Sequence, residues 1–332
     1  MSNEAEQIKN LLLRRKADLC SGGLLDLLLI GSVATGERCN RVGHSDIDIL
    51  AIYDDTVAAI DSAQRTAALR TLIALDPHVH VGIRWRKVSE LDAFFRHLSL
   101  FGFHRGNVLP LLCSGHFELK AVDNRAPAAD EALCVLAECL WSEIRLRELV
   151  PRSVGERLYI DSKLALAYLN LLLVQQRIFL PLHAVRVQRW EALNLTGGID
   201  LDAVLAGKFG SAPNTAASAC AAAVGVLRKQ VYHAATALEG CASQDSPPQF
   251  WYDGLGSTED RVRLAKAVVS ALYERLTNKN SMPEAPSVAV SWFAEFAKQF
   301  LGNGRHLVAG LHKLRVRHSS ASSRDWGHIL VQ

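Results

Sequence analysis

The spacing of hydrophobic residues changes once along the chain, and the change divides the chain into two parts. Up to about residue 125, short apolar runs are separated by polar segments that contain glycine, a pattern typical of strands and turns. After the polar sequence DNRAP at residues 123–127, apolar residues recur at helical spacing and no strand is indicated. We therefore predict an α+β domain over residues 1–125 and an all-α helical domain over residues 126–332.

The first part predicts a small mixed sheet with helices between its strands. Strands are expected at residues 25–31, 46–53 and 78–86, with one or two short strands near residues 107–122. Helices are expected at residues 4–20, 56–75 and 88–99. In the second part, helical periodicity or alanine richness marks six segments: 128–149, 155–178, 183–194, 212–239, 259–277 and 287–301. Residues 242–258 form a long predicted loop with two prolines.

The sequence LLLIGSVATGERCNRVGHSDIDILAIY, at residues 27–53, carries the candidate chemistry. Side chains alternate between the two faces of a strand, so Asp46 and Asp48 point to the same side, about 7 Å apart along the backbone. The apolar residues between and after them, Ile47, Ile49 and Ala51, point the other way, into a core. Two carboxylates on one face repel each other unless something positive lies between them.

A magnesium ion fits that requirement, because magnesium is usually held by one or two carboxylates together with substrate phosphates. Gly31 and Ser32 follow the first strand and supply backbone N–H groups and a hydroxyl that suit those phosphates. Gly36 lets the backbone pass close to a ligand, because it has no Cβ atom.

This motif resembles the signature of the DNA polymerase β-like nucleotidyltransferase superfamily: an apolar strand, Gly-Ser, an intervening segment, and then Asp-x-Asp between apolar residues. The sub-pattern Gly31-Ser32-x-x-x-Gly36 with Ser45-Asp46-Ile47-Asp48 is most similar to that of small-molecule adenylyltransferases and minimal nucleotidyltransferases. The motif covers about one tenth of the chain, and the layout extends over about the first 125 residues.

The resemblance implies that Asp46 and Asp48 are catalytic and hold Mg²⁺, and that ATP or another nucleoside triphosphate is the substrate. Ser32 would contact the β- and γ-phosphates, and Gly31 and Gly36 would line the nucleotide site. Ser45 would stabilise the turn before the first aspartate.

The third predicted strand departs from the family pattern. Family members carry a third carboxylate there, which acts as a metal ligand and general base, whereas PHVHVGIRWR at residues 77–86 contains no acid. Three interpretations follow: His80 is the base, Asp76 reaches into the site, or catalysis has been lost. Histidine accepts a proton near neutral pH but is a poor magnesium ligand.

In the helical part, Tyr159 and Lys163 lie four residues apart, on one face of a predicted helix. The family commonly uses a basic residue of its helical domain to reach the triphosphate, and Lys163 is the candidate here, with Arg145, Arg147 and Arg152 as alternatives. Arg228 and His233 fit the loose Arg-x4-His spacing of HEPN-type helical domains, some of which are RNases, but an ordinary surface location is favoured for this pair.

Composition narrows the classes of partner and compartment. The 332 residues are 49% hydrophobic and 21% charged, with a formal net charge of +3, too small to require nucleic acid as a partner. Seven cysteines without a C-x-x-C pair favour reduced, buried thiols. The first twenty residues do not resemble a signal peptide, and no apolar stretch is long enough to span a bilayer. A cytoplasmic location without a membrane partner is expected.

The leading hypothesis is a magnesium-dependent nucleotidyltransferase that transfers a nucleoside monophosphate, AMP from ATP in the first instance, to a hydroxyl of a small molecule or a protein. The alternative is a catalytically inactive protein of the same fold that acts as a nucleotide-binding or partner-binding regulatory module. The missing third acid favours the alternative, and retention of both Asp46 and Asp48 favours the enzyme. Modification of nucleic-acid ends is disfavoured by the modest charge.

Overall fold

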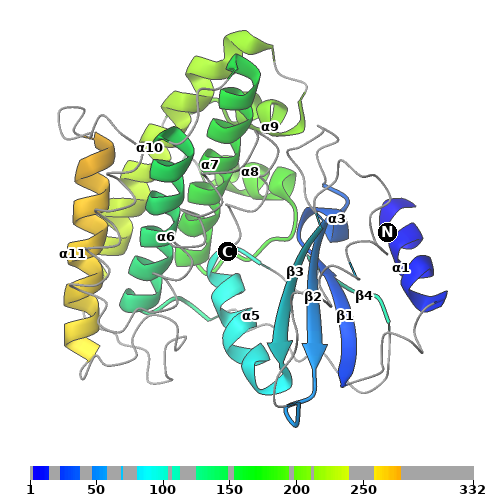
Figure 1. Cartoon of the computed structure of the whole chain (residues 1–332). Helices are drawn as coiled ribbons and strands as arrows, with labels where there is room; N and C mark the ends of the chain where they lie inside the picture. The colour runs from blue at the N-terminus through cyan, green and yellow to red at the C-terminus, as the bar shows by residue number, and fades with distance from the viewer. Residues whose placement is uncertain are drawn as a thin grey trace. The chain divides into compact units, whose positions relative to one another are not determined.

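The computed structural model describes residues 3–14, 23–37, 47–57, 69, 81–103, 107–112, 125–148, 153–193, 198–210, 213–238 and 258–277 (Figure 1). Several predicted segments lie outside these residues: the last part of the helix at 4–20, the helix at 56–75 beyond Val57 apart from Leu69, the loop at 242–257 and the helix at 287–301.

The chain divides into two compact units, and each is described by itself. Among the described residues, the first unit reaches as far as residue 112 and also takes in Phe179–Arg186. The second comprises Arg125–Ile178 and the residues from Val187 onwards. The first unit is called the sheet unit below, and the second the helical unit.

The sheet unit contains a mixed sheet of four strands: β1 (Leu24–Ile30), β2 (Ile47–Tyr53), β3 (Val81–Lys87) and β4 (Val108–Pro110). The strand order is β3-β2-β1-β4, with β1 antiparallel to both β2 and β4, and β2 parallel to β3. The predicted α+β class with a small mixed sheet is confirmed. The bounds of β1 and β2 lie within one residue of the predicted ones, and β3 ends one residue later than predicted, while its predicted first residues, 78–80, lie outside the described ranges.

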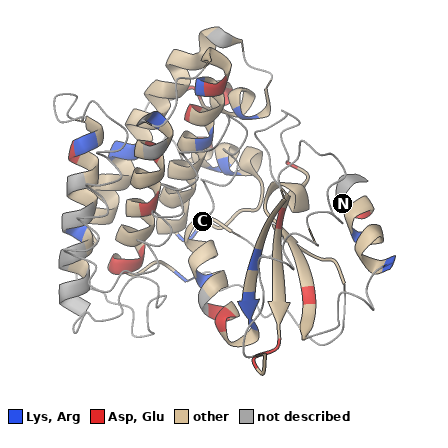
Figure 2. Cartoon of the chain, in the orientation of Figure 1, with Lys and Arg blue, Asp and Glu red and all other residues tan. Residues whose placement is uncertain are grey.

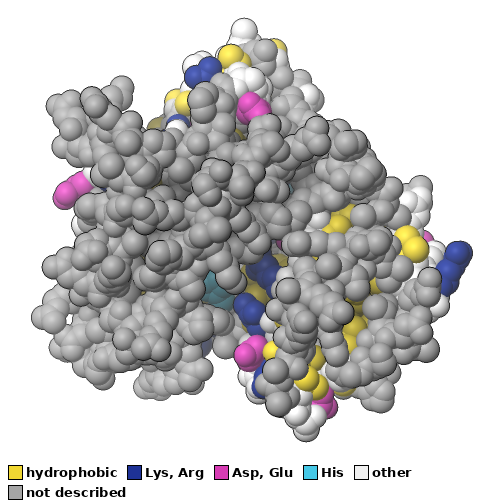
Figure 3. All heavy atoms as spheres, in the orientation of Figure 1, with side chains coloured by type: hydrophobic (Ala, Val, Ile, Leu, Met, Phe, Trp, Pro, Cys, Tyr) yellow, Lys and Arg dark blue, Asp and Glu magenta, His cyan; other side chains and the backbone are white. Residues whose placement is uncertain are grey.

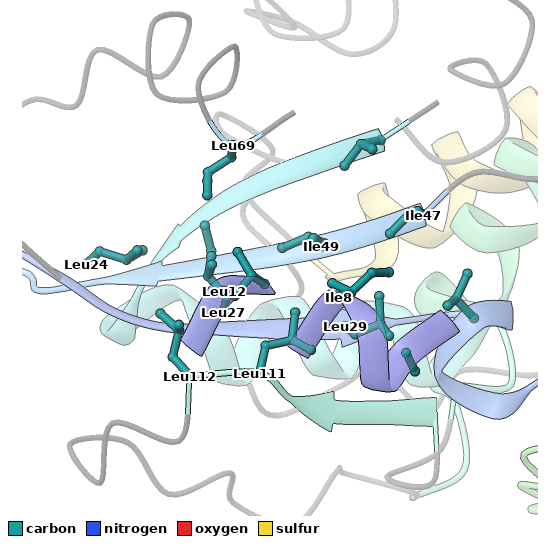
Figure 4. Packing of buried hydrophobic residues seen from close by; sticks show 14 residues of the cluster. Ile8, Leu12, Leu24, Leu27, Leu29, Ile47, Ile49, Leu69, Leu111 and Leu112 are labelled. Atoms are coloured by element: carbon teal, nitrogen blue, oxygen red, sulfur yellow. The ribbon is translucent and has the colours of Figure 1, made fainter. Parts of the chain in front are cut away.

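One face of the sheet is covered by α1 (Asn3–Arg14), whose apolar stripe is Ala5, Ile8 and Leu12. These three side chains are fully buried, because their spacing places them on one side of the helix. They pack on Leu27 and Leu29 of β1 and, with neighbouring strands, form the cluster in Figure 4. Ile47, Ile49 and Ala51 of β2 belong to the same cluster, as the alternation predicted.

The opposite face also carries a core, which the sequence analysis did not predict. Leu50 and Ile52 lie on the same side of β2 as Asp48 and are fully buried. They pack with Leu28 and Ile30 of β1 and with three residues of α5 (Leu91–Leu100): Leu91, Phe94 and Phe95. A strand buried on both faces has a nearly continuous apolar sequence, as in the sequence LLDLLLI of β1. The aspartate-bearing face of the sheet is therefore covered over much of its length.

A short one-turn helix, η1 (Val88–Glu90), joins β3 to α5, where one helix at 88–99 was predicted. Asp55, in the turn after β2, fixes this connection by accepting hydrogen bonds from the backbone N–H of Ser89 (3.2 Å) and its hydroxyl (2.7 Å). Asp26 of β1 is buried and accepts hydrogen bonds from the backbone N–H groups of Leu27 (2.7 Å) and Leu112 (3.2 Å). It thereby ties the segment after β4 to β1.

The segment Phe179–Arg186 joins the sheet unit although it lies far along the chain. Arg186 is buried and donates from Nη2 to the carbonyl of Gly102 (2.7 Å) and from Nε to the carbonyl of Leu180 (2.6 Å). Asn107 donates to the carbonyl of Pro181 (3.0 Å). Burial lowers the pKa of Arg186 to about 10, and the nearby Glu37 carboxylate partly opposes this shift.

The described residues of the helical unit form helices and the turns between them. The helices are α6 (Ala129–Glu148), α7 (Val154–Gln175), α8 (His183–Ala192), α9 (Leu201–Phe209), η3 (Asn214–Ala216), α10 (Ala217–Thr236) and α11 (Thr258–Thr277). The first residues of α8 belong to the sheet unit, because the division of the chain falls between Arg186 and Val187. Helix α9 was not predicted. Helix α10 packs along α7, and α11 packs along α6. None of the helices in the described ranges has the length and apolar character needed to cross a membrane.

A buried charge cluster joins three helices of this unit. The fully buried Glu143 of α6 accepts hydrogen bonds from Arg147 (2.7 Å), from Arg228 of α10, and from the hydroxyl of Tyr168 of α7 (2.7 Å). Arg147 also pairs with Asp161 of α7 (3.1 Å). The surface location favoured for Arg228 is wrong, because only 13% of its side chain is exposed. Its predicted companion His233 is exposed.

Candidate functional site

The first half of the sequence motif forms a turn at the end of β1. Gly31 has φ 76° and ψ −149°, a combination that is nearly restricted to glycine, and it ends the strand. One helical turn follows, α3 (Ser32–Thr35), closed by hydrogen bonds from Thr35 N–H to the Gly31 carbonyl and from Gly36 N–H to the Val33 carbonyl, both 3.2 Å. Gly36 ends this turn in the left-handed conformation (φ 77°). The predicted residues Gly31, Ser32 and Gly36 therefore belong to one tight loop.

The second half of the motif lies directly beside this loop. In the antiparallel pairing of β1 and β2, Ile30 is opposite Asp48. A Cβ atom built at Gly31 would lie 3.3 Å from Oδ2 of the Asp48 carboxylate, so the backbone of Gly31 approaches the acid closely. Asp48 is half-buried. The tertiary structure thus brings together Gly31 and Asp48, seventeen positions apart in the sequence.

Three other predicted site residues, Ser45, Asp46 and His80, lie outside the described residues, as do the alternatives Asp76 and Arg152.

The third strand presents basic residues to the face of the sheet that carries Asp48. In the parallel register of β2 and β3, Asp48 is opposite Gly82, Leu50 opposite Arg84, and Ile52 opposite Arg86. Because these positions alternate with the core residues of β3, Arg84 and Arg86 lie on the same face as Asp48. Figure 2 shows the basic positions along β3 in blue and the acidic position of β2 in red. Within its described length, β3 contains no carboxylate.

Arg86 is held by the core that covers this face. Its guanidinium lies 5.0 Å from the ring centroid of Phe94 in α5, and Nη1 donates to the carbonyl of Trp85 (2.7 Å). Burial lowers the pKa of Arg86, although the nearby Glu90 carboxylate opposes this shift. Figure 3 shows basic atoms (dark blue) directly beside hydrophobic atoms (yellow) on the face viewed. Arg86 therefore has a packing role, and Arg84 is the next basic residue of β3 toward Asp48.

The part of the site that is described is compatible with magnesium. Asp48 would supply a hard oxygen ligand beside Gly31, where a Cβ atom would lie 3.3 Å from its carboxylate, and magnesium needs only one or two carboxylates besides phosphate oxygens. Over the described ranges, no group of three or more histidine, cysteine, aspartate or glutamate residues is placed to hold a metal without such phosphates.

The loop that contains Gly31 is connected to the segment Phe179–Arg186. Glu37, immediately after Gly36, accepts a hydrogen bond from the backbone N–H of His183 (2.7 Å), at the start of α8. Residues 146 positions apart therefore fix the end of the glycine loop.

Lys163 is a half-buried residue of α7, in the helical unit. Tyr159, the residue paired with it in the sequence analysis, is buried, and its hydroxyl accepts a hydrogen bond from Nζ of Lys208 in α9 (3.1 Å). The same ammonium group lies 4.9 Å from the centroid of the tyrosine ring. Tyr159 is thus held within the helical unit. Of the alternatives to Lys163, Arg147 is partly exposed and pairs with Glu143 and Asp161 of the helical unit.

Sequence reasoning missed Arg84. The signal was available, because the alternation that places His78, His80 and Gly82 on one face continues to Arg84 and Arg86. The sequence did not show that β2 and β3 pair in parallel. This pairing aligns Gly82 with Asp48 and places Arg84 two residues further along the same face.

Comparison with known proteins yields no relative: no protein-family model matches the chain, and no curated protein matches it.

Proposed function

We propose that this protein is a magnesium-dependent nucleotidyltransferase, which transfers AMP from ATP to a hydroxyl group of a small molecule or a protein and releases pyrophosphate. The observation that carries the proposal is the proximity of the two halves of the motif: Gly31 adopts a conformation nearly restricted to glycine, and a Cβ atom there would lie only 3.3 Å from the Asp48 carboxylate. A carboxylate beside a glycine turn is the arrangement that a metal-bound triphosphate requires, because phosphates need close backbone approach and the metal needs an acidic ligand.

The residues have separate roles in this proposal. Asp48 and Asp46 would hold Mg²⁺, which when bound neutralises negative charge on the triphosphate. The Gly31 and Ser32 backbone and the Ser32 hydroxyl would orient the β- and γ-phosphates, and His80 would accept the proton of the attacking hydroxyl. Positioning the acceptor in line with the α-phosphate supplies the rest of the rate enhancement.

A second candidate function is a nucleotide-binding regulatory module without transferase activity. It is favoured by the composition of β3, where Gly82 lies opposite Asp48 and Arg84 follows it on the same face. The superfamily pattern places a carboxylate on this strand, where it acts as the general base. A protonated arginine cannot accept a proton and therefore cannot take that role.

The first prediction concerns metal and nucleotide. Magnesium and ATP together should raise the melting temperature of the protein, since a ligand at a hundred times its Kd stabilises the folded state by about 2.7 kcal/mol. In Asp46→Asn with Asp48→Asn the ATP-dependent shift should disappear, while Asp202→Asn, at an exposed position of α9, should retain it. Differential scanning fluorimetry measures all three proteins. A shift of unchanged size in the double variant would refute the proposed site.

An assay of nucleotide transfer distinguishes the transferase from the regulatory module. The protein is incubated with ATP labelled at the α-phosphate, magnesium, and a cell extract as the source of acceptors. A labelled acceptor that is absent with the double variant would establish the transferase. Magnesium-dependent ATP binding without any labelled acceptor would favour the regulatory module.

A further inference from the structure

We propose that Arg84 binds a phosphoryl group of the ligand, so that β3 supplies a cation where the superfamily pattern has a third carboxylate. The inference rests on the proposed nucleotide site and adds a residue and a ligand chemistry to it. The partner chemistry is a phosphoryl dianion, carried either by the nucleotide or by the acceptor.

The strand register supports the placement. Arg84 is opposite Leu50, two residues along β2 from Asp48, so Arg84 and Asp48 are diagonal neighbours on one face. Two residues along a strand span about 7 Å and neighbouring strands lie about 5 Å apart, so a long arginine side chain can reach across this diagonal. Gly82, which lies directly opposite Asp48, has no side chain to intervene between the acid and the arginine. Arg84 is half-buried, and its partner Leu50 is fully buried, so the base of the arginine is fixed in the sheet.

The neighbouring arginine on this face, Arg86, has a packing role. Arg86 lies over Phe94 and donates to the carbonyl of Trp85, so the core under α5 accounts for its position. Along β3, Arg84 lies two residues closer than Arg86 to the position opposite Asp48, and so closer to Gly31. A guanidinium there suits a phosphoryl group, because its planar fork donates two parallel hydrogen bonds to phosphate oxygens.

The test measures anion binding directly and needs no catalytic turnover. Inorganic tripolyphosphate is titrated calorimetrically into the full-length protein without metal. Removing one charged hydrogen-bonding partner costs about 1.5 to 3 kcal/mol, so Arg84→Gln should weaken binding about 10-fold to 150-fold. Arg84→Lys keeps the positive charge but loses the planar guanidinium that donates two parallel hydrogen bonds. This variant should weaken binding by about 2-fold to 10-fold.

Lys87→Gln is the matched control, since it removes one positive charge from the same strand but from the opposite face. Its affinity should stay within about twofold of that of the unsubstituted protein, because the half-buried Lys87 lies on the face of the sheet opposite to Asp48 and its charge acts on the anion only at long range, where salt screens it. The Arg84→Lys variant also keeps the proposal testable if Arg84→Gln does not fold, which circular dichroism reveals.

Two further titrations identify the source of the phosphoryl group. If Arg84→Gln weakens binding of ATP with magnesium as much as binding of tripolyphosphate, Arg84 binds the nucleotide's phosphate chain. If ATP binding is unchanged but orthophosphate binds more weakly to the ATP-saturated variant, Arg84 binds a phosphorylated acceptor. Equal affinities of the variant and the unsubstituted protein for all three anions would overturn the inference, as would the absence of binding to the unsubstituted protein.

The aspartate variants distinguish a failure of the inference about Arg84 from a failure of the proposed function. Loss of magnesium-dependent ATP binding in the Asp46→Asn, Asp48→Asn double variant, with full tripolyphosphate affinity in Arg84→Gln, would retain the nucleotide site and exclude Arg84. The reverse result would retain an anion site at Arg84 and exclude the transferase.

Discussion

At the scale of single residues, Gly31 and Asp48 define the candidate site. Gly31 adopts a backbone conformation that costs other residues about 1 to 3 kcal/mol, and it does so where its missing side chain leaves room for a carboxylate.

Replacing Gly31 by alanine should therefore have two separable effects. Backbone strain should lower the free energy of unfolding by about 1 to 3 kcal/mol. The new Cβ atom, 3.3 Å from Oδ2 of Asp48, should displace the carboxylate and weaken magnesium-ATP binding by about tenfold, or 1.4 kcal/mol. Chemical denaturation measures the first effect and calorimetry the second.

Gly198→Ala provides the control for strain alone. Gly198 has a similar φ of +81°, and a Cβ atom there would meet nothing within 4 Å. This variant should lose stability and keep its nucleotide affinity. Equal nucleotide affinities of the two glycine variants would show that the approach of Gly31 to Asp48 has no role in binding.

At the scale of elements, the two units use buried polar groups to fix how their parts meet. In the sheet unit, Asp26 binds the backbone of the segment after β4. In the helical unit, Glu143 joins α6, α7 and α10 through two arginines and a tyrosine. A buried ion pair contributes little net stability when it is complete, but removal of one partner leaves the other charges uncompensated.

Glu143→Gln should consequently destabilise the protein by about 3 kcal/mol, because the mostly buried Arg228 loses its counter-charge, whereas Arg147 is more exposed and keeps its pair with Asp161. Tyr168→Phe removes one hydrogen bond to the same carboxylate and leaves both arginines in place, so it should cost only about 0.5 to 1.5 kcal/mol. Urea unfolding of the two variants gives the comparison. Equal losses would mean that packing, and not charge, explains the burial of Glu143.

At the scale of the whole molecule, the chain returns to its first unit after building two long helices of the second. The segment Phe179–Arg186 contacts Asn107, Gly102 and Glu37 within the sheet unit. The contact at Glu37 adjoins the glycine loop, so a part of the chain distant in sequence supports the candidate site.

Arg186→Ala should loosen this segment. The substitution leaves the carbonyls of Gly102 and Leu180 without their guanidinium donors, at a cost of about 1 to 3 kcal/mol. Backbone amides of residues 179–186 should then exchange with solvent about 5-fold to 150-fold faster in mass-spectrometric hydrogen exchange. Arg189→Ala, at an exposed position one turn further along α8, should leave exchange in this segment unchanged. Unchanged exchange in both variants would show that the other contacts alone hold the segment.

Local patterns determined the main elements of this protein and one half of its candidate chemistry. Alternation in IDILAIY predicted β2 and the face that packs on α1, and Gly-Ser after an apolar run predicted the turn after β1. Burial of the three cysteines that the structure describes, Cys134, Cys139 and Cys220, was also expected from their spacing.

Only the tertiary structure determined which residues meet. The core under α5, the alignment of Gly82 with Asp48, and the return of Phe179–Arg186 to the sheet unit all depend on pairing between distant segments. A sequence period shows which residues share a face of one element, because the period follows from backbone geometry. It does not show which element covers that face or in which register two strands pair, because packing across the whole chain decides both.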